Sequence, residues 1–135
     1  SGILTADLPK VSGAAYGNLV PQVDADGNDI GGIRNVYIQA PIGTYTGWNL
    51  FNKSFYEDGF CTLQGSFVPF AATKAERAAN GDPRPSLEER YPTKDAYVAA
   101  VKRAAENLVK ERYLLAEDAN RLIAAAEKDG VRTAP

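Results

Sequence analysis

Residues 44–92 read TYTGWNLFNKSFYEDGFCTLQGSFVPFAATKAERAANGDPRPSLEERYP, and this stretch decides how the chain folds. Eight of the 13 aromatic side chains lie between Tyr45 and Phe70, together with the only Trp and the only Cys. Most of the stretch lacks the periodicity of a strand or a helix. Because aromatic rings are costly to leave in water, we expect this segment to pack against a scaffold rather than to form a solvated linker.

From Thr73 onward, local signals predict helices. The patterns Thr73-Lys74-Ala75-Glu76 and Ser86-Leu87-Glu88-Glu89 both match a capping box, in which a hydroxyl and a carboxylate satisfy free backbone N–H groups. The first helix is expected to end near Asn80-Gly81, where glycine suits a left-handed terminus. The second is expected to be a single turn that stops at Pro92.

Two longer helices follow and are predicted to form an antiparallel hairpin. The first is capped by Thr93 and runs to about Tyr113; the second runs from about Ala116 to Asp129, before Gly130. Apolar residues at helical spacing predict the buried stripes. These are Tyr97, Val98, Val101, Ala104, Ala105, Leu108 and Val109 in the first helix, and Leu115, Ala119, Leu122, Ile123 and Ala126 in the second.

The residues before the aromatic stretch predict less regular structure. Residues 1–34 read as an irregular lead-in that contains a hairpin. Within them Asp24, Asp26, Gly27 and Asp29 invite comparison with a calcium loop, but a Gly at position six and a Glu at position twelve are missing. We therefore favour an Asp-Gly turn and predict no metal site.

Residues 35–41, NVYIQAP, alternate apolar and polar side chains and predict a half-buried strand that Pro41 ends. The predicted fold class is α+β, with an irregular, aromatic-rich N-terminal half that holds short strands and a C-terminal helical hairpin. We expect residues 1–70 and residues 71–135 to form one structural unit.

Composition excludes several classes of function. The 135-residue chain has a formal net charge of −2, which argues against nucleic-acid binding. No apolar run approaches the length of a membrane span. The chain contains no His, so a Ser-His-Asp or Cys-His catalytic device cannot be completed within it. One Cys excludes an internal disulfide, and no cofactor motif is present.

Carboxylates remain as candidate catalytic groups, because Asp and Glu are plentiful. Those on the predicted helices lie on exposed faces, where their pKa values stay ordinary, so we predict no catalytic residue. Tyr45, Trp48 and Asn49 are the candidate substrate-binding residues, since rings between small polar residues suit stacking and hydrogen bonding. The same rings also suit a simple anchor of the loop onto a scaffold, and that alternative stays open.

Four blocks of the sequence together resemble a bacterial family of "alpha/beta hydrolase domain" proteins, in its C-terminal region. The blocks are VPQVDADGNDIGGIR, APIGTYTGWNL, GSFVPFAATKAERAANGDPRPSLEERYP and AYVAAVKRAAENLVKERYLLAEDANRLIAAA. The family would place Pro at the position of Ala116. More important, the chain has no G-x-S-x-G nucleophile elbow, so no catalytic residue can be carried over from the family.

The resemblance implies that this chain is a non-catalytic C-terminal part of an α/β-hydrolase-like, esterase-like protein, secreted or periplasmic. It would be part of an α/β-hydrolase-like fold once a missing N-terminal portion is present. That portion, or another protein chain, is expected to dock on Tyr45, Trp48, Phe51 and Phe55; a homo-oligomer is also open. The alternative is a stand-alone binding or structural module without enzymatic activity.

Overall fold

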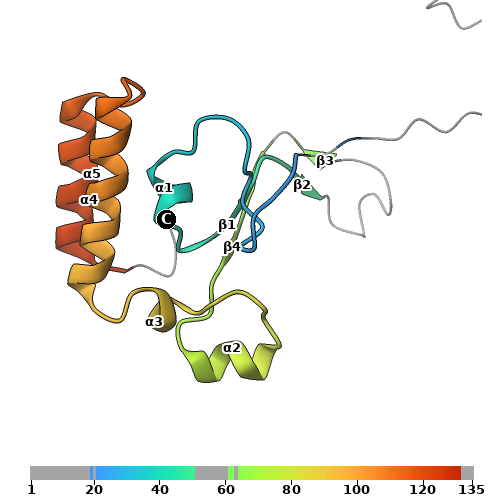
Figure 1. Ribbon diagram of the computed structural model, residues 1–135. Helices are drawn as coiled ribbons and strands as arrows, with labels where there is room; N and C mark the ends of the chain where they lie inside the picture. The colour runs from blue at the N-terminus through green and yellow to red at the C-terminus, as the bar shows by residue number, and fades with distance from the viewer. Residues whose placement is uncertain (1–18, 20, 51–60, 63, 132–135) are drawn as a thin grey trace, which may run out of the picture.

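The computed structural model describes residues 19, 21–50, 61–62 and 64–131. Its C-terminal part is a hairpin of two antiparallel helices, α4 (Lys94–Lys110) and α5 (Ala116–Asp129). A short helix, α1 (Val36–Gln39), lies between this hairpin and a two-stranded ribbon (Figure 1). Helices α2 (Lys74–Asn80) and α3 (Leu87–Arg90) lie together at one end of the molecule. The mixture of helix and strand confirms the predicted α+β class.

The ribbon joins the two ends of the aromatic-rich segment between Tyr45 and Phe70. Strand β1 (Gly43–Thr46) pairs antiparallel with β4 (Ser66–Pro69), with Tyr45 opposite Phe67. Beyond a break, β2 (Asn49–Leu50) pairs with β3 (Cys61–Thr62). The described residues 44–50, 61–62 and 64–69 are therefore more regular than their lack of periodicity predicted, because pairing between distant residues sets the ribbon.

One hydrophobic core connects α1, the ribbon, α3 and the helical hairpin. Its buried members are Val36, Ala40, Ile42, Phe70, Leu87, Tyr97, Val101, Ala104, Ala105, Leu108, Ala119 and Ala126. The predicted stripe of α4 lies within this core, except that Val98 and Val109 pack against it half-buried, as do Leu122 and Ile123 of α5. Within the described residues, no helix has the length and apolar character needed to cross a membrane.

The prediction of a strand at residues 35–41 is wrong, because residues 36–39 form α1. Asn35 caps this helix, since its side-chain oxygen accepts a hydrogen bond from the Ile38 N–H (3.1 Å). Val36 and Ala40 are both buried, which is the i, i+4 spacing of a helical face. Over so short a segment, the alternation of apolar residues fits a helical turn as well as a strand.

The predicted caps of α2 and α3 are formed, with one difference. Ser86 and Glu89 make a complete capping box at α3. Thr73 accepts from the Glu76 N–H (3.1 Å), but the Glu76 carboxylate bonds the N–H of Ala72 rather than that of Thr73. Gly81 ends α2 in the left-handed conformation, as predicted (φ 63°).

The connection between α4 and α5 differs from the sequence expectation at two residues. Helix α4 ends at Lys110 rather than near Tyr113, because Arg112 takes a left-handed backbone (φ 68°). The Tyr113 N–H then bonds the Leu108 carbonyl (2.8 Å), which closes the helix end. Leu115 is 63% exposed and not part of the buried stripe, because it precedes the first turn of α5 as its N-cap.

Candidate functional site

The structure brings two of the three predicted substrate-binding residues to one groove. Trp48 follows β1 at the break in the ribbon and is half-exposed. Tyr45 belongs to β1 and lines the same groove, whereas Asn49, at the start of β2, does not. Phe51 and Phe55, the other predicted docking residues, lie outside the described residues.

We call this feature the edge groove, because it runs beside β1. It has a volume of about 510 Å³, within the range of about 300–1,000 Å³ that is usual for ligand sites. One wall comes from the turn that precedes α1 and the other from β1 and the residues after it. The lining residues are Pro21, Val23, Gly27 and Asp29 on the first wall, and Tyr45, Thr46, Gly47 and Trp48 on the second.

The Tyr45 ring is held by other aromatic rings. Its centroid lies 4.9 Å from that of Phe67 on β4 and 6.3 Å from that of Tyr37 on α1. Burial, with smaller effects of Tyr97 and Tyr37, raises the pKa of Tyr45 to about 12. The Tyr45 hydroxyl is therefore neutral at physiological pH, and it has no hydrogen-bond partner among the described residues.

The first wall of the groove is a turn built by its own side chains. The Asp24 carboxylate accepts hydrogen bonds from the N–H groups of Asp26 (2.9 Å) and Asn28 (3.0 Å). Gly27 takes a positive φ of 77°, which confirms the predicted Asp-Gly turn. Desolvation opposes ionisation of Asp24, but the two N–H groups and Arg34 together lower the pKa of Asp24 below its ordinary value.

Two carboxylates of this turn form ion pairs with arginines of the same chain. Arg34 lies 2.5 Å from Asp24, and Arg90 forms an ion pair with Asp26. In the part of the chain that the structure describes, no group of three or more acidic, His or Cys side chains is arranged to hold a metal ion.

Asn28 fixes the turn to β1. Its side chain is fully buried, its amide donates to the Gly43 carbonyl (3.2 Å), and its oxygen accepts from the Tyr45 N–H (2.8 Å). A carboxamide that makes both bonds occupies the place of a peptide group on a neighbouring strand. Asn28 therefore holds the two walls of the groove at a fixed spacing.

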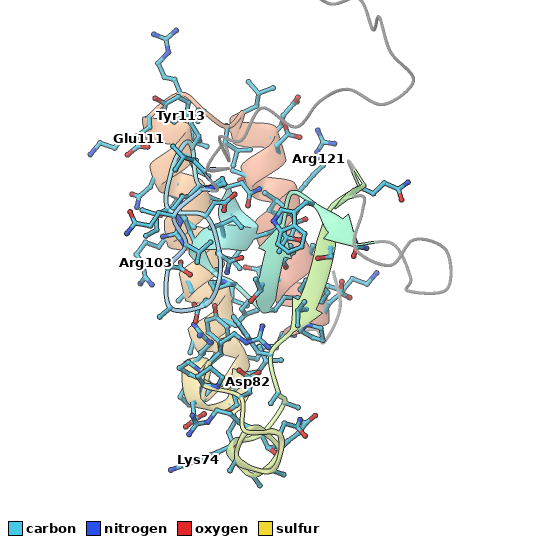
Figure 2. The ribbon with its side chains drawn as sticks, turned by 90° about the vertical axis from the view of Figure 1, so that its right-hand side faces the viewer. Lys74, Asp82, Arg103, Glu111, Tyr113 and Arg121 are labelled. Atoms are coloured by element: carbon cyan, nitrogen blue, oxygen red, sulfur yellow. The ribbon has the colours of Figure 1, made fainter. Side chains whose placement is uncertain are left out.

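A second set of contacts, which we call the arginine network, consists of Asp26, Thr44, Asp82, Arg84 and Arg90. Arg84 bonds both oxygens of Asp82 from its Nε (2.9 and 3.2 Å) and one of them from a terminal nitrogen (2.7 Å). It also donates to the Thr44 hydroxyl (2.7 Å). Figure 2 shows Asp82 between the ribbon and α2. These contacts tie the connector after α2 to both strands of the ribbon.

Two further donor positions of Arg84 are occupied by β4. They bond the carbonyl oxygens of Val68 (3.1 Å) and Pro69 (3.3 Å). A guanidinium has five N–H donors, and Arg84 thus has a partner for each of them. The hydrogen bonds from Arg84 lower the pKa of Asp82 to about 2, so this pair is charged at neutral pH.

Arg90 completes the network from α3. Its guanidinium lies 4.2 Å above the ring of buried Phe70, and that of Arg84 lies 5.1 Å from the same ring. Arg90 also pairs with the Asp26 carboxylate, while the Thr44 hydroxyl donates to the Asp26 carbonyl. Cations on an aromatic face are attracted by its electrons, so both arginines help to hold Phe70 in place.

Sequence reasoning missed the arginine network. From the sequence, Asp26 is predicted only as one residue of a turn. The contact between Asp26 and Arg90 spans 64 positions of the chain. The only available signal was that Arg84 and Arg90 are two of the three arginines in one block shared with the family, and this signal does not identify their partners.

The residues of the site are better suited to binding a ligand than to acid–base catalysis. The carboxyls of Asp24, Asp82 and Glu89 have lowered pKa values, in the case of Glu89 through hydrogen bonds from the Ser86 N–H and hydroxyl. A general acid at neutral pH requires a raised carboxyl pKa, so these three do not fit that role. The groove instead presents an exposed indole, a strand edge and an acidic rim residue, Asp29.

Comparison with protein families gives one match. The model of the alpha/beta hydrolase domain family matches residues 5–124 of the 135 residues. The chain belongs to the alpha/beta hydrolase domain family. The match covers the turn, the ribbon, α2, α3, α4 and most of α5. Neither the comparison with curated proteins nor that with solved structures found a match.

Proposed function

We propose that this chain is the non-catalytic C-terminal part of an α/β-hydrolase-like protein with esterase-like activity. In this role it covers the hydrolase core, and its edge groove buttresses or extends the substrate pocket. Residues 1–70 and 71–135 act as one unit. The proposal is supported by the family match over residues 5–124, taken together with the absence of His from the 135-residue sequence.

The chemical step then depends on residues outside this chain. Ester hydrolysis by this fold uses a Ser nucleophile on a G-x-S-x-G turn and a His base, and the 135 residues contain neither the motif nor a His. Tyr45 and Trp48 would contact substrate by stacking and apolar packing, because a neutral phenol and an indole supply no base at neutral pH.

The docking side of the chain is the end that carries the edge groove. Trp48 is 50% exposed there, with Val23 close by in the groove at 49%. The proposed N-terminal hydrolase portion covers these side chains and contacts Phe51 and Phe55. Apolar area removed from water in this way stabilises a complex by about 25 cal/mol per Å². A secreted or periplasmic location is part of the proposal and rests on the family resemblance.

The test is hydrolysis of p-nitrophenyl butyrate by two proteins: this chain alone and a longer protein that includes the N-terminal hydrolase portion. We expect the chain alone to match the buffer blank and the longer protein to turn over. In the longer protein, Trp48→Ala is expected to lower kcat/KM about tenfold through loss of apolar contact.

Tyr113→Ala is the matched control, because Tyr113 is similarly exposed at the far end of the helical hairpin (Figure 2). It should leave kcat/KM unchanged. Heat-sensitive hydrolysis by the 135-residue chain alone would refute the proposal. A longer protein without activity, together with two-state unfolding of the chain alone, would favour the stand-alone binding module.

A further inference from the structure

The outer edge of β1 has alternating hydrogen-bonding positions that can be assigned from the register. The Phe70 N–H bonds the Ile42 carbonyl (3.1 Å), and the pairing places Thr44 opposite Val68 and Thr46 opposite Ser66. Because hydrogen-bonded pairs alternate in an antiparallel ladder, these residues direct their backbone groups to β4. Gly43 and Tyr45 therefore direct theirs away from β4.

The first outward position is already filled by a peptide-like group. Asn28 bonds the Gly43 carbonyl and the Tyr45 N–H, as described above. This shows that the edge accepts an amide in the geometry of an added strand. The next outward group of β1 is the Tyr45 carbonyl, followed by the N–H of Gly47, the first residue after β1; neither makes a backbone hydrogen bond to another described residue.

The edge groove begins at this position, which no described residue fills. Tyr45, Thr46, Gly47 and Trp48 form its β1 side, and the exposed side chain of Val23 lies on the opposite wall. The outer edge of β4 differs, because Pro69 has no N–H and Arg84 occupies its carbonyl. A strand added along β4 would therefore lose main-chain bonds at Pro69, whereas the outer edge of β1 has the groove beside it.

We propose that the edge groove binds an extended polypeptide segment, which adds to β1 beyond Asn28 as a third strand. Main-chain bonds to the Tyr45 carbonyl and the Gly47 N–H set its position, and an apolar side chain packs on Trp48. We assign this segment to the hydrolase portion, and this assignment rests on the proposed function. The arrangement gives that portion a defined attachment to the C-terminal part.

The test uses a fluorescein-labelled peptide, acetyl-Lys-Thr-Val-Thr-Val-Thr-Lys-amide, titrated with the 135-residue chain and followed by fluorescence anisotropy. Two N-methylated peptides are matched controls, one modified at its Val amides and one at its Thr amides. Successive amides of a strand point to opposite sides, so only one set can face β1. We expect one modified peptide to bind about tenfold more weakly and the other to be nearly unaffected.

Substitutions at Gly47 test the same bond from the protein side. Gly47→Pro removes the N–H and is expected to weaken binding about tenfold. Gly47→Ala keeps the N–H, and a Cβ there meets no atom of the described residues within 4 Å, so binding should be retained. If the proline variant does not fold, the N-methylated peptides still decide the question on the unmodified chain.

Three results would overturn the inference: no peptide binding at millimolar concentration, equal effects of the two N-methylated peptides, or unchanged binding by a folded Gly47→Pro variant. The longer protein should bind the peptide more weakly than the 135-residue chain, since its own segment occupies the groove; equal binding would overturn the assignment of the occupant. None of these measurements uses ester hydrolysis, so a failure here is distinguishable from failure of the proposed function.

Discussion

Arg84→Ala is expected to destabilise the ribbon more than any exposed arginine substitution does. Arg84 and Asp82 have side chains that are only 16% and 15% exposed, and the pair lies where β1, β4 and the α2–α3 connector meet. The substitution removes the partner of the Asp82 carboxylate and the hydrogen bonds that Arg84 donates to the carbonyl oxygens of Val68 and Pro69.

The magnitude follows from these contacts. Removal of one member of a buried ion pair costs about 3–5 kcal/mol, and the slight exposure of this pair places the expected loss near the lower end. We therefore predict a fall of about 3 kcal/mol in the free energy of unfolding. For a chain of this size, that corresponds to a fall in Tm of roughly 10 °C.

Urea unfolding followed by circular dichroism measures this change from the midpoint, provided that the slope stays constant. Arg121→Ala is the matched control, because Arg121 pairs with Glu117 and Asp118 at 73% exposure of its side chain. Exposed pairs contribute about 0–1 kcal/mol, so the control should change little.

Arg84→Lys refines the test, since it keeps the charge but loses the planar fork of donors. We expect it to recover less than half of the lost stability. A loss below about 1 kcal/mol for Arg84→Ala, or no difference between that variant and Arg121→Ala, would refute the structural role of the arginine network.

Two further predictions concern the ribbon and the pH dependence of stability. A Cβ at Gly43 would lie 2.5 Å from the Phe67 ring, so Gly43→Ala should destabilise the chain by about 2 kcal/mol in urea unfolding. Gly47→Ala should be neutral, because a Cβ there has open space among the described residues. Equal effects of the two substitutions would contradict the packing described. The pKa of Asp82 falls from 3.8 to about 2 on folding, so its contribution to stability is present above pH 3.8 and is lost as the pH falls through 2. The free energy of unfolding should therefore fall less steeply with decreasing pH in Asp82→Asn than in the unmodified chain. An unchanged slope would argue against the Asp82–Arg84 pair.

The C-terminal half could be predicted from its sequence because its signals are local. Helix α5 has the expected bounds, and the caps at Thr73, Ser86 and Thr93 accept the N–H bonds that their positions indicated. Each of these features depends on residues three or four positions apart, so neighbouring letters of the sequence contain the relevant information.

The N-terminal half could not be predicted equally well, because its structure depends on distant contacts. Residues 36–39 became a helix that packs on α4, although their alternation favoured a strand. Tyr45 faces Phe67 across the ribbon only because β1 and β4 pair over more than twenty positions. The sequence identified Tyr45 and Trp48 as candidates from their ring-rich setting and also predicted the Asp-Gly turn, but it did not indicate that this turn forms the opposite wall.

The arginine network and the edge groove are physically connected through two residues. Asp26 belongs to the turn on the first wall, and its carboxylate pairs with Arg90 of α3. Thr44 belongs to β1, accepts from Arg84 and donates to the Asp26 carbonyl. Loss of Arg84 therefore releases contacts on which both walls depend, although Arg84 does not line the groove. It follows that the helical half of the chain sets the width of a site formed by the N-terminal half, and that neither half alone should bind the extended segment.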